Sequence, residues 1–128
     1  MKFKSIYSPN FNHKKRSRKS IKFIIIHYTG MQSERESLVR LCNFKSKVSC
    51  HYLINRKGKV FRLVKDQNVA WHAGESCWAK YISLNKNSIG IELVNRGHKF
   101  GYTDYSSKQI SELVVLCNFL IKKYQISK

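Results

Sequence analysis

The sequence predicts a mixed α/β fold with a central mixed β-sheet flanked by helices. Two apolar runs, FIIIHYT at residues 23–29 and SIGIELVN at residues 88–95, have the length and composition of buried strands. A helical pattern follows each run, and a hairpin pattern lies between them. The order strand, helix, hairpin, loop, strand, helix is typical of one layered domain. With 128 residues and 42% hydrophobic content, the chain can form one real core.

Residues 1–20 precede the first strand and are predicted to form a basic N-terminal arm with little regular structure, ahead of a domain at residues 21–128. The chain has 25 Lys and Arg against 7 acidic residues, a net charge of +18, and six of these cations lie in residues 13–22. Such a run is either a solvated segment or a binding site for a polyanion. Because basic enrichment alone supports only non-specific binding, we expect no specific nucleic-acid partner.

The first predicted strand, residues 23–29, carries four consecutive apolar residues before His27. A run without alternation indicates a strand buried on both faces, which favours the interior of a sheet over its edge. The strand ends on the imidazole, directly before a Tyr-Thr-Gly turn.

The first predicted helix starts near residue 34. Ser33 and Glu36 have the S-x-x-E spacing of a capping box. The apolar stripe that follows comprises Leu38, Leu41 and Cys42, with Lys45 on the same side.

The middle of the chain has a hairpin pattern. Residues 51–54 and 59–64 are rich in strand-forming residues and flank a turn with Gly58. Residues 65–88 read as irregular, and residues 88–95 as a second central strand.

The last element is a long helix opened by Ser106 and Gln109. Its predicted core-facing stripe comprises Ile110, Leu113, Val114, Cys117, Leu120, Ile121 and Tyr124.

Targeting signals and metal-binding cysteine motifs are not visible in the sequence. No apolar run approaches the ~18 residues of a membrane span, and the N-terminus lacks the apolar core of a signal peptide, which favours a cytoplasmic location. The four cysteines show no CxxC spacing, so a zinc ribbon is not expected.

His27 and Glu92 stand out because each interrupts or ends an apolar strand. A buried carboxylate without a partner is strongly disfavoured, so Glu92 must meet a cation, a metal site or a hydrogen-bond network. The residues alone allow two interpretations of this pair. Either Glu92 pairs with one of the many cations and His27 bonds a carbonyl, or the two belong to a catalytic site.

Several motifs occur in a characteristic order: SPNFN, IIIHYTGM, SCHYLINRKGKVFRLVKDQNVAWHAG, LNKNSIGIELVN and YTDYSSKQISELVVLCNFLIKKYQI. Together they resemble the zinc-dependent N-acetylmuramoyl-L-alanine amidases of the AmpD and AmiD type, the amidase type 2 family, which is related to phage amidase lysozymes and peptidoglycan recognition proteins. The resemblance runs from about Ser8 to the end of the chain.

The resemblance implies the amidase fold, a Zn²⁺ cofactor, and hydrolysis of the amide between N-acetylmuramic acid and L-alanine in peptidoglycan or muropeptides. His27 matches the first zinc ligand, and Glu92 matches the catalytic glutamate. His72 matches a residue of the substrate groove. The motifs that border this groove contribute Trp71, Asn85 and Asn95.

Four other histidine and cysteine residues have different expected roles. His51 is expected to be structural, whereas Cys50 occupies a position that faces the site in some relatives. His98 and Cys77 are further in-chain candidates for a metal ligand, without support from a family motif.

One segment of the family pattern is missing from this sequence. The family's second and third ligands, a His and an Asp, come after the long helix, in a segment resembling GHSDIAPGRKxDPG. The 128 residues end before such a segment, so we expect a C-terminally truncated member. Without that segment, apolar surface near Ile25, Ile91 and the final helical turn is expected to lie partly uncovered. The chain should then be marginally stable or self-associate, and the missing segment should stabilise it. A non-catalytic muropeptide-binding module is the alternative function.

Overall fold

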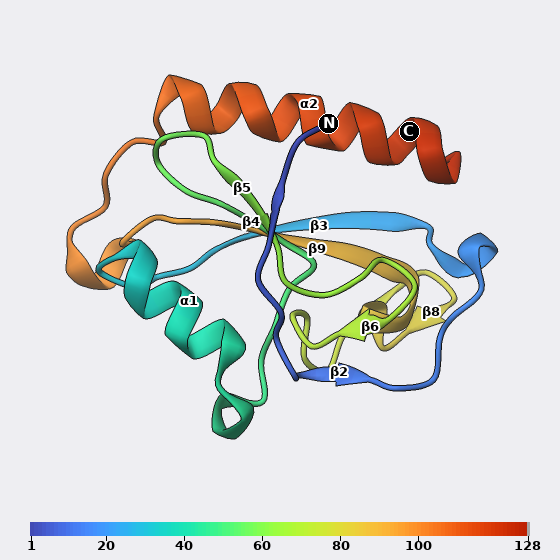
Figure 1. The fold of residues 1–128 in the computed structure, drawn as a ribbon. Coiled ribbons are helices and arrows are strands. Elements are labelled where there is room, and N and C mark those ends of the chain that lie inside the picture. Colours follow the sequence, from blue (N-terminus) through green and yellow to red (C-terminus); the bar gives the residue numbers. More distant parts are fainter. Residues whose placement is uncertain (128) are drawn as a thin grey trace.

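The computed structural model describes residues 1–127 and confirms the mixed α/β class. A five-stranded mixed sheet lies between two helices, α1 (Glu34–Cys42) and α2 (Ser107–Tyr124), which pack on opposite faces (Figure 1). The strands of this sheet are β1 (Lys4–Ser5), β5 (Val60–Arg62), β4 (Tyr52–Ile54), β9 (Ser88–Leu93) and β3 (Phe23–Tyr28), in that spatial order. None of the helices within residues 1–127 is long and apolar enough to cross a membrane.

The short elements lie outside this sheet. Strand β2 (Phe11–Asn12) pairs with β6 (Val69–Ala70), and β7 (Cys77–Trp78) pairs with β8 (Tyr81–Ile82). The 3-10 turns are η1 (Arg18–Ser20), η2 (Phe44–Ser46), η3 (Leu84–Asn87) and η4 (His98–Phe100). The loop predicted to be irregular therefore contains three two-residue strands.

Strand β9 has a central position, as predicted, and is parallel to both β3 and β4. Strands β4 and β5 form the predicted antiparallel hairpin, and the turn places Gly58 at φ +83°, in the left-handed region that favours glycine. The register of β3 and β9 sets His27 directly opposite Glu92.

Both helices begin where the capping residues predict. The hydroxyl of Ser33 accepts a hydrogen bond from the backbone N–H of Glu36, and that of Ser106 accepts one from Gln109. At the first cap, the Glu36 carboxylate accepts a hydrogen bond from the N–H of Gln32. The caps therefore fix where each helix enters the fold.

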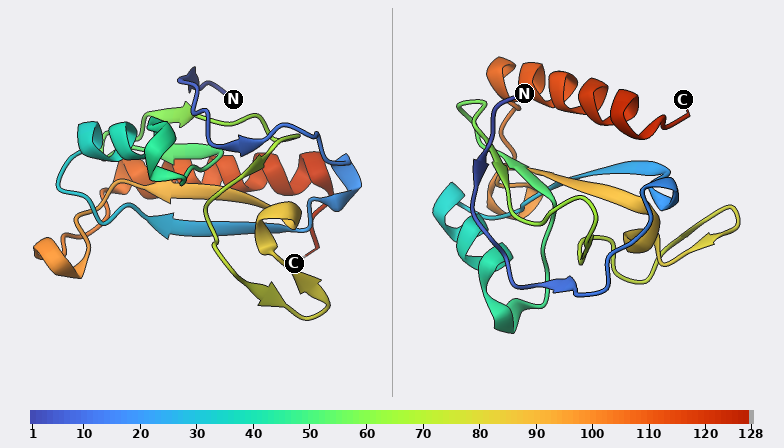
Figure 2. Two further views of the ribbon diagram at one scale, coloured as in Figure 1. Left: turned by 90° about the horizontal axis from the view of Figure 1, so that it is seen from below. Right: turned by 45° about the vertical axis from the view of Figure 1, so that its right-hand side comes forward.

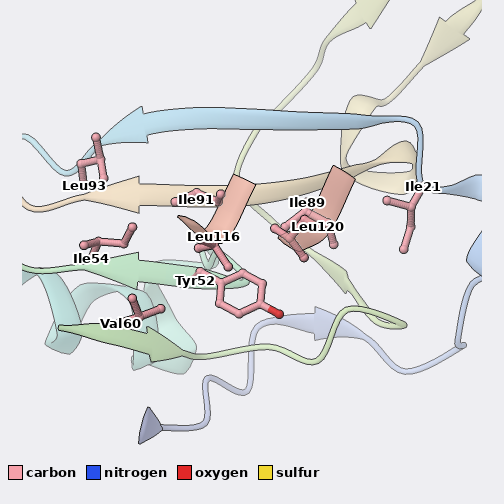
Figure 3. Packing of buried hydrophobic residues seen from close by; sticks show 9 residues of the cluster. All are labelled: Ile21, Tyr52, Ile54, Val60, Ile89, Ile91, Leu93, Leu116 and Leu120. Carbon is pink, nitrogen blue, oxygen red and sulfur yellow. The ribbon is translucent and has the colours of Figure 1, made fainter. Parts of the chain in front are cut away.

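The main core lies between α2 and the sheet (Figure 3). Its buried residues are Ile21, Tyr52, Ile54, Val60, Ile89, Ile91, Leu93, Leu116 and Leu120. The predicted stripe of α2 was partly wrong, because Ile110 and Val114 are exposed while Gln109 and Leu116 are buried. Buried Gln109 donates hydrogen bonds to the carbonyls of Ile54 and Val94, which orients the helix on the strand ends.

A second core lies on the α1 face of the sheet. It contains Leu41, Cys50, Leu53, Phe61, Leu63 and Val94. Leu38 and Cys42 pack against it, as the predicted α1 stripe requires. Lys45 lies beyond the helix, in η2.

The prediction that residues 23–29 form an interior strand is wrong. Strand β3 is one of the two edge strands of the sheet (Figure 2, left), and Ile26 and Tyr28 are 49% and 50% exposed. A run of apolar residues indicates that both faces of a strand are hydrophobic. It does not show whether the strand has a partner strand on each side. The uncovered apolar surface accordingly includes Ile26, whereas Ile91 is fully buried and Ile25 is half-buried.

The arm, predicted to have little regular structure, is part of the folded domain. Strand β1 pairs in parallel with β5, and β2 pairs with β6. Buried Asn10 donates hydrogen bonds to the carbonyls of Asn43 and Val48. Arg16 is not a solvated cation either, because its guanidinium donates to the carbonyls of Asp66 and Asn85.

Candidate active site

His27 and Glu92 lie side by side on neighbouring strands. They are opposite one another in the parallel register of β3 and β9, so their side chains leave the same face of the sheet. Residues at alternate positions share a face of a strand, and Ser88 and Gly90 therefore lie on the same face of β9 as Glu92. This is the face covered by α1.

A pocket of about 280 Å³ opens on this face. Its walls come from the β3 end, α1, the segment before β4, the segment after β6, and β9 itself. The lining residues are Thr29, Met31, Ser37, Arg40, Leu41, Val48, Ser49, Trp71, His72 and Glu92.

The Glu92 carboxyl group is largely desolvated in this pocket. Burial raises its pKa from 4.5 to about 7, and the nearby positive charge of Arg40 offsets this only in part. Its Oε2 atom is buried and has no hydrogen-bond partner within residues 1–127. Glu92 also forms no salt bridge in this part of the chain, so the reading of Glu92 as a paired structural carboxylate is not supported. A carboxyl group with a pKa near 7 can both accept and return a proton at neutral pH.

His72 lies directly against His27, with 3.0 Å between His72 Nδ1 and His27 Nε2. Its ring occupies the space over Gly90, where an added Cβ atom would lie 2.4 Å from the ring. The Asn85 side-chain oxygen accepts hydrogen bonds from the backbone N–H groups of His72 and Ala73, which fixes this part of the loop. Burial lowers the pKa of both histidines, that of His72 to about 2.

Trp71 forms part of the pocket wall and is held by the arm. Its indole N–H donates to the side-chain oxygen of Asn12 at 2.8 Å, and its backbone N–H donates to Ser49 Oγ. Asn12 was not predicted as a site residue, and neither were Ser49, Ser88 or Arg40. Only SPNFN, the segment with Asn12, carried a sequence signal, since it preceded the first strand in the family resemblance.

The two asparagines expected at the groove do not line this pocket. Asn85 anchors the loop of His72 as described. Asn95 is buried, donates to the carbonyl of Thr103 and accepts from the N–H of Gly97, and it borders a neighbouring depression. Direct contact of either side chain with substrate stays a prediction.

His51 has the structural role expected of it. Its Nδ1 accepts from the N–H of Gly90, and its Nε2 lies 2.8 Å from the carbonyl of Asn68 and therefore donates to it. Burial lowers the pKa of His51 to about 3. Cys50 is fully buried in the second core, and burial raises its thiol pKa, which disfavours the thiolate that a metal would need.

The residues described do not complete a zinc site. No group of three or more His, Cys, Asp or Glu side chains within residues 1–127 is arranged to hold a metal ion, whereas a catalytic zinc needs three protein ligands. His98 and Cys77, the other candidates, join no such group. His27 has the right chemistry for one ligand, but the set as a whole does not fit the ion.

A family model for N-acetylmuramoyl-L-alanine amidases, Amidase_2, matches residues 17–128. The chain belongs to this amidase family. The match covers both strands of the site, the loop with Trp71 and His72, and both helices.

The chain is similar to several proteins of known activity. It is 37% identical over 118 residues to N-acetylmuramoyl-L-alanine amidase AmiD of Escherichia coli, covering 83% of this chain and 42% of that relative. It is 27% identical to 1,6-anhydro-N-acetylmuramyl-L-alanine amidase AmpD of Haemophilus influenzae, covering 94% and 72%. The chain thus spans less than half the length of AmiD.

Solved structures agree with this assignment. E. coli AmiD, in complex with the substrate anhydro-N-acetylmuramic acid-L-Ala-D-γ-Glu-L-Lys, superposes with a TM-score of 0.75 at 34% identity, covering 91% of this chain and 48% of that structure. AmpDh3 of Pseudomonas aeruginosa gives 0.77 at 30% identity, covering 94% and 52%. The fold of these amidases is therefore shared over at least 91% of this chain.

Proposed function

We propose that this chain supplies the substrate groove and the general base of an N-acetylmuramoyl-L-alanine amidase, which hydrolyses the amide between N-acetylmuramic acid and L-alanine. The observation that carries the proposal is Glu92, a carboxyl group that is unpaired within residues 1–127 and has a pKa raised to about 7, in a pocket beside His27. The relatives named above act on this bond, and one of them binds an anhydro-muramoyl tripeptide.

The proton steps follow from Glu92. Its carboxylate accepts a proton from a water molecule as the water oxygen attacks the carbonyl carbon of the scissile amide. The same carboxyl group then returns the proton to the leaving nitrogen of L-alanine as the C–N bond breaks. A general base of this kind contributes about 10²-fold or more to the rate.

Zinc dependence belongs to the same proposal. Because residues 1–127 do not complete a metal site, the two further donors must be supplied before hydrolysis can be tested as a zinc reaction. We expect the chain alone to bind well under one zinc per molecule and to show negligible amidase activity. Supplying a family segment that carries the His and the Asp, fused or as a separate peptide, should produce zinc-dependent activity that a chelator abolishes.

The test uses an anhydro-muramoyl tripeptide and measures release of the free tripeptide by liquid chromatography and mass spectrometry. In the supplemented protein, Glu92→Gln should lower the rate at least about 100-fold. Near-normal hydrolysis by the Gln variant would contradict the role of Glu92. Stoichiometric, chelator-resistant zinc in the chain alone would show that in-chain residues replace the family ligands.

A second candidate is muropeptide binding without hydrolysis. The lack of a metal-binding group within residues 1–127 favours it. Isothermal titration with the same tripeptide ligand separates the cases: binding without turnover in the supplemented protein supports a binding module, and the absence of both would exclude both functions.

A further inference from the structure

We propose that Ser88 and His72 are positioning residues that keep a hydrogen atom on Nε2 of His27 and so leave its Nδ1 as the nitrogen with the free lone pair. The inference deepens the proposed function, on which its catalytic relevance rests. It follows from the direction of three consecutive hydrogen bonds.

The first bond fixes the Ser88 hydroxyl. Ser88 Oγ lies 2.6 Å from the carbonyl oxygen of Leu84 and 3.2 Å from His72 Nε2. A carbonyl oxygen can only accept, so the single hydroxyl hydrogen of Ser88 is committed to Leu84. Toward His72 the hydroxyl oxygen must therefore accept, and His72 carries its hydrogen on Nε2.

The second step concerns the other nitrogen of His72. The ring packs over Gly90 and beside His51, and within residues 1–127 its two nitrogens bond only to Ser88 and His27, so no carboxylate is bonded to it. A buried positive charge without such a partner is strongly disfavoured, so the ring is neutral. A neutral imidazole carries one hydrogen, and its second nitrogen is an acceptor. With Nε2 protonated, His72 Nδ1 must accept.

The third hydrogen bond, between His72 and His27, determines which nitrogen of His27 is the donor. Because His72 Nδ1 accepts, His27 Nε2, 3.0 Å away, has to donate. The neutral His27 ring is then left with its lone pair on Nδ1, which makes no hydrogen bond within residues 1–127. Which nitrogen of a histidine is available to bind or accept is commonly set in this way by the bond that the other nitrogen makes.

The surroundings hold the three groups in place. Ser88 is fully buried on β9, and the His72 ring packs over Gly90 two residues further along the same face. The backbone on either side of the His72 ring is anchored to Asn85. A rigid acceptor at this point makes the choice of tautomer at His27 a property of the fold.

The test is long-range ¹H–¹⁵N correlation spectroscopy on the full ¹⁵N-labelled chain near pH 7.5, which distinguishes protonated from unprotonated ring nitrogens. His27 and His72 should both appear as the Nε2–H tautomer. Exposed His13 and His98 serve as internal references in the same spectra. A His27 ring with its hydrogen on Nδ1 would overturn the inference.

Variants then test each link. His72→Asn keeps an acceptor oxygen near the position of Nδ1 and should keep His27 in the Nε2–H form. His72→Ala removes the acceptor, so His27 should relax to a mixture of tautomers. Ser88→Ala removes the acceptor of the His72 Nε2–H, so His72 should no longer be held in one tautomer. Unchanged His27 spectra in His72→Ala, or equal mixtures in the Asn and Ala variants, would exclude His72 as the group that sets the tautomer.

These results are independent of turnover. Predicted tautomers in a protein that never hydrolyses muropeptide, even when supplemented, would contradict the proposed function and leave the positioning roles intact. Hydrolysis together with a Nδ1–H tautomer at His27 would contradict the positioning roles and leave the proposed function intact.

Discussion

At the scale of single residues, Glu92 shows a conflict between stability and chemistry. A carboxyl group that is hard to ionise in the folded chain, but ordinary in the unfolded chain, weakens the fold at neutral and higher pH. Its pKa is about 7 when folded and 4.5 in the reference state, so the folded protein holds an extra proton between these values. Stability from this group is fully present below pH 4.5 and is lost as the pH rises through 7.

Glu92→Gln should therefore stabilise the protein, and more so at high pH. A shift from 4.5 to about 7 corresponds to about 3 kcal/mol at pH 8, which the Gln variant avoids. Urea unfolding of both proteins at pH 5 and pH 8 measures the difference. An advantage for Gln that is equal at both pH values would show that the raised pKa is not its cause.

The buried histidines make the stability of the fold depend on pH in acid solution. His51 and His72 have folded pKa values of about 3 and about 2, below the value of 6.5 for an accessible histidine, so the unfolded chain binds more protons between these limits. Stability should fall as the pH drops below 6.5, by about 1.4 kcal/mol per pH unit for each histidine. His72→Asn should lower this slope by about 1.4 kcal/mol per pH unit, the contribution of one histidine, in acid titrations followed by circular dichroism. An unchanged slope would mean that His72 is charged in the folded protein.

At the scale of elements, Gly90 lets a loop reach the sheet. An added methyl group would collide with the His72 ring, so Gly90→Ala should cost about 1–3 kcal/mol in the wild type. In the His72→Ala background the space is free, and the same change should cost close to nothing. Chemical unfolding of the four proteins measures the coupling, and additive costs would contradict the contact.

Helix α2 offers a matched pair of adjacent positions. Leu116 is 0% exposed and Val115 is 50% exposed. Truncating Leu116 to Ala leaves a cavity and should cost about 2–5 kcal/mol. Val115→Ala should change stability by less than about 0.5 kcal/mol. Equal costs in thermal or urea unfolding would mean that α2 packs in a different rotation.

The elements also show what the sequence could predict. The caps at Ser33 and Ser106 predicted both helix starts, because capping depends on residues only a few positions apart. The rotation of α2 was mistaken, because the sequence pattern did not reveal that Gln109 would be buried to bond the carbonyl ends of two strands. The edge position of β3 was missed for a similar reason, since pairing depends on residues far away in the chain.

The site was predictable in part. The motif resemblance identified His27, Glu92 and His72, and the structure brings these three together. Asn12 and Ser88 act through hydrogen bonds to residues distant in sequence, which no local pattern encodes. A single serine or asparagine is too common to stand out until the fold places it beside Trp71 or His72.

At the scale of the whole molecule, high charge and an open sheet edge oppose each other. Strand β3 exposes Ile26 and Tyr28 and has no partner on its outer side within residues 1–127, a geometry that invites pairing with another chain. A net charge of +18 resists this contact. We expect a monomer at low salt and concentration-dependent association at about 1 M salt, where charges are screened within about 3 Å.

Sedimentation velocity at both salt concentrations checks this expectation. Ile26→Lys adds a charge to the edge and should suppress association, whereas Lys45→Gln, away from β3 in η2, should not. A chain that stays monomeric at high salt would show that the edge is already protected.

The long sequence separation of the paired strands also sets an order of events during synthesis. Lys4 pairs with Phe61, and Phe23 pairs with Ser88, so neither of the first two sheet strands has its partner while the early chain leaves the ribosome. Until residue 88 has emerged, the apolar run that starts at Phe23 has no strand to pair with. Unpaired apolar strands of a nascent chain are where chaperones bind and where aggregation starts. The chain therefore completes its five-stranded sheet only when β9, the strand that carries Glu92, has been made.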